Sequence, residues 1–200
     1  MKRIVIIALA VFAFAFASCQ KDPIGGTAVQ DASGQWYATW YFVTTSGELV
    51  EPLEIPSYGL KFNNTNLFLT YNTADNEPDK LFLDDLNAAY QWKDPDYGTI
   101  IKMYMDFKVK ANLDPATLKF SAAEAENLYE ENTLTLEGGI IKNGAKSAQG
   151  KPLDSIWISY KINEEGLQEW IEDPEDGLGV DGFDHFLITG KTYTGFAEDE

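Results

Sequence analysis

Apolar and polar residues alternate with a period of two along much of the chain after residue 34, and this pattern constrains the fold more than any other feature. The clearest run covers residues 99–110, where every second side chain from Ile101 to Val109 is apolar and shares one face. The other face carries Asp106, Tyr104 and three lysines. Successive side chains of a β-strand point to opposite faces, so this run predicts a long strand that is buried on one side only.

Other runs of the same kind are separated by turn residues at the intervals that all-β folds show. Together they predict about nine antiparallel strands, at residues 35–45, 58–63, 67–71, 80–84, 99–110, 117–121, 133–142, 153–162 and 184–194.

Helix is scarce in this pattern. Residues 121–132 are rich in Ala and Glu and predict one short helix. Residues 163–171 predict a helical turn with Leu167 and Trp170 facing inward, and the acidic, glycine-containing stretch 173–182 predicts a loop.

The first residues have the features of an export signal. Lys2 and Arg3 precede an apolar run of about 14 residues, which is short for a permanent membrane span of about 20. We therefore predict a signal peptide over residues 1–18. Phe16-Ala17-Ser18-Cys19 resembles a bacterial lipobox, which implies that Cys19 is the lipidated first residue of the mature protein. The alternative is a plain secretory signal that happens to contain a cysteine.

The residues after Cys19 bear on location. Gln20-Lys21-Asp22 resembles the tag that sends some lipoproteins to the outer face of the outer membrane. The resemblances together imply a lipid-anchored protein of the cell envelope at the outer membrane, with surface exposure as a hypothesis. Residues 19–33 contain Gly25 and Gly26 and lack apolar periodicity, so they predict a tether to the domain.

Charge and composition exclude several classes of function. The chain has 15 basic and 32 acidic residues and a net charge of -17, and without Lys2 and Arg3 it has 13 basic residues, a net charge of -19 and no arginine. Nucleic acid binding needs clustered cations, so no nucleic-acid partner is expected. One cysteine and one histidine exclude a thiolate metal cluster and a two-histidine zinc site, and we predict no metal and no cofactor. A calcium ion among the acidic residues of 173–184 stays open as an alternative.

Both a sandwich and a barrel satisfy the strand pattern, and strand length favours the barrel. Predicted strands of ten to twelve residues exceed the usual five or six, and long tilted strands suit a closed barrel with a ligand cavity. The first strand begins with Gly34-Gln35-Trp36, which resembles the lipocalin signature, where the tryptophan closes one end of an eight-stranded barrel. Lipocalins lay an arginine over that tryptophan, and here Lys161 or Lys191 would have to replace it. We predict one lipocalin-like antiparallel barrel over residues 34–200, with about eight to nine strands and one or two short helices.

Several short segments resemble a family of bacteroidal lipoproteins described as lipid-binding putative hydrolases. They are Gly25-Gly26-Thr27-Ala28-Val29, Gly34-Gln35-Trp36-Tyr37, Tyr71-Asn72-Thr73-Ala74, Asp84-Asp85, and the closing stretch from His185 to Phe196. The resemblance covers nearly the whole mature chain. It implies a calycin-like barrel with an apolar ligand, while no catalytic motif of a hydrolase can be placed on these residues.

The predicted inward faces are rich in aromatic and sulfur-containing side chains, which suit apolar ligands of variable shape. The candidate ligand-binding residues are Trp36, Trp40, Phe42, Tyr58, Phe62, Met103, Met105, Phe107, Tyr160 and Phe186. The alternative is a dry core in which the same side chains only pack against each other. We favour a membrane-anchored protein that binds a small apolar or lipid-like ligand in the barrel without catalysis.

Two other functions stay open. An esterase-like hydrolase would use His185 as the base for Ser155 or Ser159. The chain has no Gly-x-Ser-x-Gly motif, and neighbours on a regular strand point to opposite faces, so Asp184 is not expected to orient His185. A surface accessory module would instead bind a glycan or a protein partner through exposed aromatic side chains such as Trp92.

Overall fold

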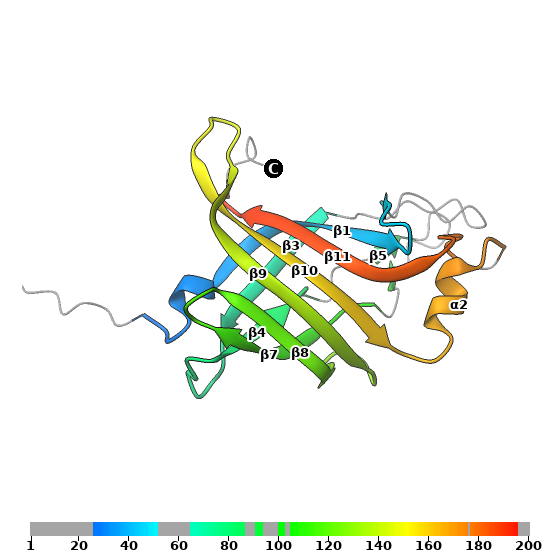
Figure 1. Cartoon of the computed structure of the whole chain (residues 1–200), viewed down its shortest axis with the longest axis horizontal. Coiled ribbons are helices and arrows are strands. Elements are labelled where there is room, and N and C mark those ends of the chain that lie inside the picture. Colours follow the sequence, from blue (N-terminus) through cyan, green and yellow to red (C-terminus); the bar gives the residue numbers. More distant parts are fainter. Residues whose placement is uncertain are drawn as a thin grey trace, which may run out of the picture.

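A computed structural model of the chain describes residues 26–51, 65–86, 91–93, 100–102, 105–175 and 177–195, with only the backbone described for 91–93 and 100–102. The helical segments of these residues are the 3-10 helix η1 (Gln30–Ala32) and the α-helix α2 (Leu167–Glu172). The strands, drawn in Figure 1, are β1 (Gly34–Thr44), β2 (Leu49–Val50), β3 (Thr65–Asn72), β4 (Lys80–Asp84), β5 (Gln91–Lys93), β6 (Ile100–Lys102), β7 (Lys108–Asp114), β8 (Lys119–Glu126), β9 (Thr133–Lys146), β10 (Pro152–Asn163) and β11 (Phe183–Thr192).

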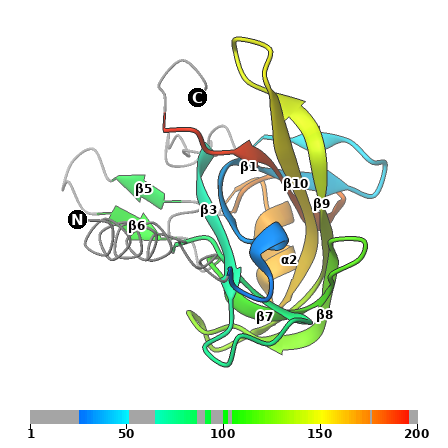
Figure 2. The same cartoon turned by 90° about the vertical axis from the view of Figure 1, so that its left-hand side faces the viewer.

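The main sheet closes on itself. Its strands follow the order β11-β10-β9-β8-β7-β4-β3-β1, each antiparallel to its neighbours, and the pairing of β1 with β11 completes an eight-stranded barrel. β2 adds a short extra strand beside β1, and β5 and β6 pair only with each other. Figure 2 looks into the barrel, with η1 in front and α2 behind it. The antiparallel barrel that the sequence predicts is thus confirmed.

Alternate residues of the strands turn into the barrel, as a period of two requires. In β1, Trp36, Ala38, Trp40 and Phe42 are each at most 3% exposed, whereas the residues between them are half-buried. Phe42 lies opposite Phe186 on β11. Burial of these large side chains, at about 1.5–3 kcal/mol each, provides the main driving force for closing the sheet.

The prediction of one strand over residues 99–110 is wrong. β6 and β7 are separate strands, and residues 105–107 form a bend before β7 begins. At this bend the Phe107 amide donates to Oδ2 of Asp85 at 2.8 Å, and the Asp85 amide donates to the Phe107 carbonyl at 3.2 Å. Because the bend interrupts the alternation, Asp106 is fully buried instead of facing outward, together with Met105 and Phe107.

The helix predicted over residues 121–132 is also wrong, because β8 occupies the first half of this segment and the second half contains no helix. Ser121 pairs with Glu137 of β9 and Ala122 pairs with Leu136, so the segment supplies a strand that the barrel needs between β7 and β9. A bulge between Ala122 and Ala125, with Glu124 at a φ of 49°, accommodates the helix-favouring residues. Strand pairing therefore overrides a weak local preference for helix.

Helix α2 overlaps the last part of the predicted helical turn at 163–171 and extends one residue beyond it. Leu167 and Trp170 pack against the core as predicted. The helix covers one end of the barrel, where Ile171 is fully buried, and η1 covers the other end, as Figure 1 shows. Val29, which precedes η1, and Ala32, its last residue, are both buried. The last residues of the predicted tether at 19–33 thus fold onto the barrel, because these two apolar side chains bury themselves there.

Within the described ranges, no helix combines the length and hydropathy needed to cross a bilayer. The predicted signal peptide at 1–18, Cys19, the predicted strand at 58–63 and the side chain of Trp92 lie outside what the structure describes.

Candidate functional site

Seven aromatic rings form a continuous group across the barrel interior, which we call the aromatic chain. Its members are Trp40, Phe42, Phe68, Phe107, Tyr160, Phe183 and Phe186. From one side, the ring centroids of Trp40 and Phe68 are 6.3 Å apart and those of Phe68 and Phe107 are 5.9 Å apart. The series continues through Tyr160, at 4.8 Å from Phe107, to Phe186, whose ring stacks on Tyr160 at 4.9 Å. These separations are typical of favourable aromatic pairs.

The aromatic chain unites five of the residues predicted to bind the ligand: Trp40, Phe42, Phe107, Tyr160 and Phe186. Trp36 and Met105 are also buried in the core, at 3% and 0% exposed. Tyr58, Phe62 and Met103 lie outside the described residues. The sequence prediction missed two members of the aromatic chain, Phe68 and Phe183. Phe68 could have been predicted, because the alternation within residues 67–71 places Phe68 and Thr70 on one face.

Trp40 brings an unsatisfied polar group into this interior. Its side chain is 1% exposed, and its Nε1–H has no hydrogen-bond partner among the residues that the structure describes. Leaving a buried donor unpaired costs about 1–3 kcal/mol. The interior therefore holds a donor that a bound molecule with an acceptor atom could satisfy.

Polar contacts fix Trp36 at the η1 end of the barrel. Its Nε1 donates to Oγ1 of Thr70 at 2.9 Å, and the same hydroxyl donates to the Ala32 carbonyl at 2.6 Å. One threonine thus connects the indole of β1 to η1. This is the end-closing position that the resemblance of Gly34-Gln35-Trp36 to the lipocalin signature implies.

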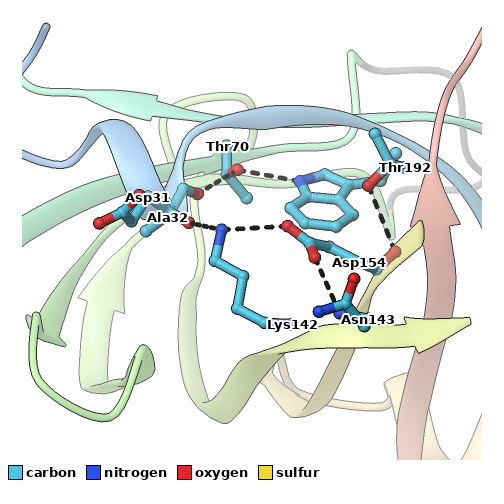
Figure 3. A network of polar contacts seen from close by, with 8 residues as sticks. Asp31, Ala32, Thr70, Lys142, Asn143, Asp154 and Thr192 are labelled. Carbon is cyan, nitrogen blue, oxygen red and sulfur yellow. Dashed lines mark hydrogen bonds and ion pairs between the residues drawn. The ribbon is translucent and has the colours of Figure 1, made fainter. Parts of the chain in front are cut away.

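Lys142 of β9 fastens the same end, as Figure 3 shows. Its Nζ donates to the Asp31 carbonyl of η1 at 2.9 Å and pairs with Oδ2 of Asp154 at 3.0 Å. The Asn143 amide donates to the other carboxylate oxygen at 2.9 Å. Burial opposes the charged form of Asp154, but these hydrogen bonds outweigh it and hold the pKa of its carboxyl below the usual value.

The two lysines that the sequence offered as replacements for the lipocalin arginine contact other residues. Lys161 pairs with Asp184 at 2.8 Å, and the Nζ of Lys191 lies 6.0 Å from the ring centroid of Tyr37. Lys142 was missed because its contact with Asp31 joins residues 111 positions apart, and no local pattern marks it.

A second polar cluster surrounds Asp84 at the end of β4. Its carboxylate accepts hydrogen bonds from the hydroxyls of Tyr71 at 2.8 Å and Tyr129 at 2.6 Å, and from the Leu86 amide at 2.8 Å. Lys108 forms an ion pair with it at 3.6 Å. Burial opposes the charged carboxylate, but the tyrosine hydrogen bonds outweigh it and lower the pKa of Asp84. Burial and the bond to Asp84 raise the pKa of Tyr129, so that its hydroxyl keeps the proton it donates.

Asp184 does orient His185, contrary to the prediction from strand alternation. The His185 Nδ1 lies 2.9 Å from Oδ2 of Asp184, and both side chains are half-buried. The reason is a register shift: Val43 pairs with His185 and Thr44 pairs with Phe183, so Asp184 is an extra residue in a bulge. The predicted serines pair further along β11, Ser159 with Leu187 and Ser155 with Lys191. Within the described residues no hydrogen bond joins either serine to His185.

In the ranges that are described, no three His, Cys, Asp or Glu side chains gather so that they could hold a metal ion. In the acidic loop considered for calcium, Oδ1 of Asp173 accepts a hydrogen bond from the Glu175 amide at 2.7 Å and so closes a local turn.

A closed eight-stranded antiparallel barrel with an apolar interior defines the class of small barrels that hold one ligand or a packed core. The family model described as lipid-binding putative hydrolase matches residues 21–197, and the chain belongs to this family. No curated protein matches the chain. Family and fold together support a lipid-binding role.

Proposed function

We propose that the protein binds a single-chain lipid with a polar head inside its barrel, without catalysis, while it is anchored to the outer membrane through Cys19. The eight strands of the barrel turn apolar side chains into its interior, and aromatic rings adapt well to an acyl chain. A lipid that carries a carboxylate or carbonyl would bring an acceptor into this interior.

The observation that carries the proposal is the Nε1–H of Trp40, which is buried and has no hydrogen-bond partner in the described part of the chain. An acceptor placed against it would gain a hydrogen bond and would also remove the cost of leaving the donor unsatisfied. A pure hydrocarbon would gain neither. The proposal therefore distinguishes lipids by their head group and not by their chain.

The test replaces Trp40 by phenylalanine, which keeps an aromatic ring and removes the N–H. Binding of oleate, measured by displacement of a fluorescent fatty acid, is expected to weaken about tenfold, the equivalent of one hydrogen bond of about 1.4 kcal/mol. Binding of 1-octadecene, which has no acceptor, is expected to change little. The matched control is Trp157→Phe, the same chemical change on the outer wall of the barrel.

Equal losses for oleate and 1-octadecene would show that Trp40 contributes only shape, and an unchanged oleate affinity would place the head group elsewhere. Methyl oleate incubated with the wild-type protein and recovered for mass spectrometry tests the absence of catalysis. We expect the ester to be recovered intact, and release of oleate would instead favour a hydrolase.

The anchoring part of the proposal rests on the lipobox-like segment that ends at Cys19. Replacing Cys19 by serine is expected to abolish incorporation of radiolabelled palmitate into the protein in cells, because the thiol that carries the lipid is absent. Ser18→Ala is the matched control and should remain labelled. Labelling of the Cys19→Ser variant would contradict the anchor.

A further inference from the structure

The outer wall of the barrel carries a hollow of about 450 Å³ across β7, β8, β9 and β10. Three of the residues that line it, Leu113, Phe120 and Gly138, are buried and face inward. The outward-facing residues that line it are Asn112, Asp114, Lys119, Ser121, Glu137 and Trp157. The hollow is thus separate from the barrel interior and from the contacts of His185 and Asp84.

Strand register explains how these side chains meet. Trp157, Gly139, Lys119 and Asp114 lie side by side on neighbouring strands, because each pairs with the next. A parallel row two residues along contains Glu137, Ser121 and Asn112. Directly paired and diagonal neighbours on one face lie about 5–8 Å apart, so Lys119, Ser121 and Glu137 are within reach of a single small molecule.

Gly139 allows the tryptophan to lie against the wall. Its position faces outward, yet it is buried, and a Cβ at this residue would lie 3.3 Å from Nε1 of Trp157 and 3.6 Å from Cγ of Lys119. The two side chains therefore converge over the glycine. The indole of Trp157 is half-buried and offers a flat aromatic surface beside the row that contains Glu137, Ser121 and Asn112.

The polar groups around this aromatic surface include both donors and acceptors. Glu137 and Asp114 supply carboxylate oxygens, while Lys119 and Ser121 supply donors, and all four side chains are exposed. Lys80 donates to Oδ1 of Asn112, which leaves the amide NH₂ of Asn112 as a further donor. Hydrogen bonds from Thr117 and Ala116 lower the pKa of Asp114, so it remains an acceptor at neutral pH.

This combination fits one ligand class better than others. Two carboxylates against one lining lysine disfavour a phosphate or another anion. An apolar ligand would leave the polar rim without partners, which is costly. A sugar ring has an apolar face of C–H groups, and each hydroxyl on its edge both donates and accepts.

We propose that the hollow binds one pyranose ring of a neutral carbohydrate, with the apolar face of the ring on Trp157. Hydroxyls on one edge of the ring donate to Glu137 and accept from Lys119 and Ser121. This site is independent of the lipid proposed for the interior, because its side chains lie on the opposite face of the strands.

The test uses the protein with all its tryptophans replaced by 5-fluorotryptophan. A glycan array of neutral oligosaccharides, with glucose, galactose, mannose and N-acetylglucosamine oligomers as probes, is expected to give binding. The best-binding oligosaccharide should then shift the ¹⁹F signal of Trp157, assigned by its loss in Trp157→Phe, and leave the signal of the buried Trp40 in place.

Trp157→Ala is expected to weaken binding of that oligosaccharide about tenfold, the loss typical of one aromatic contact. Glu137→Ala should also weaken it, and Tyr41→Ala, a half-buried aromatic of β1 outside the hollow, should not. Oleate binding by Trp157→Ala should remain at the wild-type value, which separates this site from the interior. The proposal is overturned if no neutral oligosaccharide binds, or if binding survives in both Trp157→Ala and Glu137→Ala.

Discussion

Replacing Phe186 by alanine is expected to lower the free energy of unfolding by about 3–5 kcal/mol, the range observed when a large buried aromatic side chain is removed. Phe186 is 1% exposed and touches three other members of the aromatic chain. Its ring centroid lies 4.9 Å from those of Tyr160 and Phe183 and 5.4 Å from that of Phe42. The substitution therefore removes contacts to β1, β10 and the start of β11 at once.

Urea unfolding followed by circular dichroism measures this loss, and two variants control for it. Phe186→Leu keeps most of the volume and should lose clearly less stability than the alanine variant. Tyr41→Ala removes a half-buried ring from the outer wall and should also cost less. Equal losses in Phe186→Ala and Tyr41→Ala would mean that the aromatic chain does not dominate the stability of the barrel.

The Phe186→Ala variant also tests whether the barrel interior binds a lipid. Removing the ring opens space beside Tyr160, and an acyl chain can fill space that protein atoms cannot. A ligand that binds only the folded state stabilises it by RT ln(1 + L/Kd), where L is the free ligand concentration. Oleate should therefore raise the melting temperature of Phe186→Ala at least as much as that of the wild-type protein.

Sequence alternation predicted which residues face the interior wherever a strand is regular. The alternation correctly placed five candidate side chains in the interior, namely Trp36, Trp40, Phe42, Tyr160 and Phe186. Burial of one face defines the register of a strand, because a slip of one residue would turn each of these side chains outward. This part of the candidate site could be read from the sequence since it depends only on the period of the strand.

The errors lie where side chains or pairing interrupt that period. The bond between Asp85 and the Phe107 amide ends the alternation before β7, so Asp106 is buried against expectation. The bulge at Asp184 turns its carboxylate toward His185. Neither event leaves a local mark in the sequence, because each depends on a partner strand distant along the chain.

Contacts between segments that are far apart in the sequence could not be predicted from it either. Lys142 reaches Asp31 across the barrel end, and the hollow beside Trp157 arises only when β7 to β10 stand in register. The sequence favoured Trp92 as an exposed aromatic, whereas the described structure offers Trp157. Pairing of strands, and not composition, decides which aromatic side chain stands beside polar partners.

The second large effect is expected at Asp84. Asp84→Ala should lower the free energy of unfolding by about 3–5 kcal/mol at pH 7, as is typical when one partner is removed from a buried charged network. The variant leaves the hydroxyls of Tyr71 and Tyr129 and the ammonium of Lys108 without their common acceptor. It therefore removes the side-chain contacts that join β3, β7 and the turn after β8 to the end of β4, while the backbone pairings of β4 remain. Asp84→Asn keeps the shape and one acceptor oxygen, and should lose less.

The pH dependence of the stability difference between wild type and Asp84→Ala shows whether Asp84 stabilises the fold through its charge or through packing. The pKa of Asp84 is lowered in the folded protein, so its stabilising contribution is complete above the ordinary carboxyl pKa of the unfolded chain. It is lost as the pH falls from there through the lower folded-state value, because the unfolded chain takes up the proton first. Urea unfolding of wild type and Asp84→Ala across this acidic range should show the gap in stability narrowing. The other carboxyl groups titrate in both proteins and cancel in the comparison, so a gap that stays constant with pH would assign the role of Asp84 to packing alone.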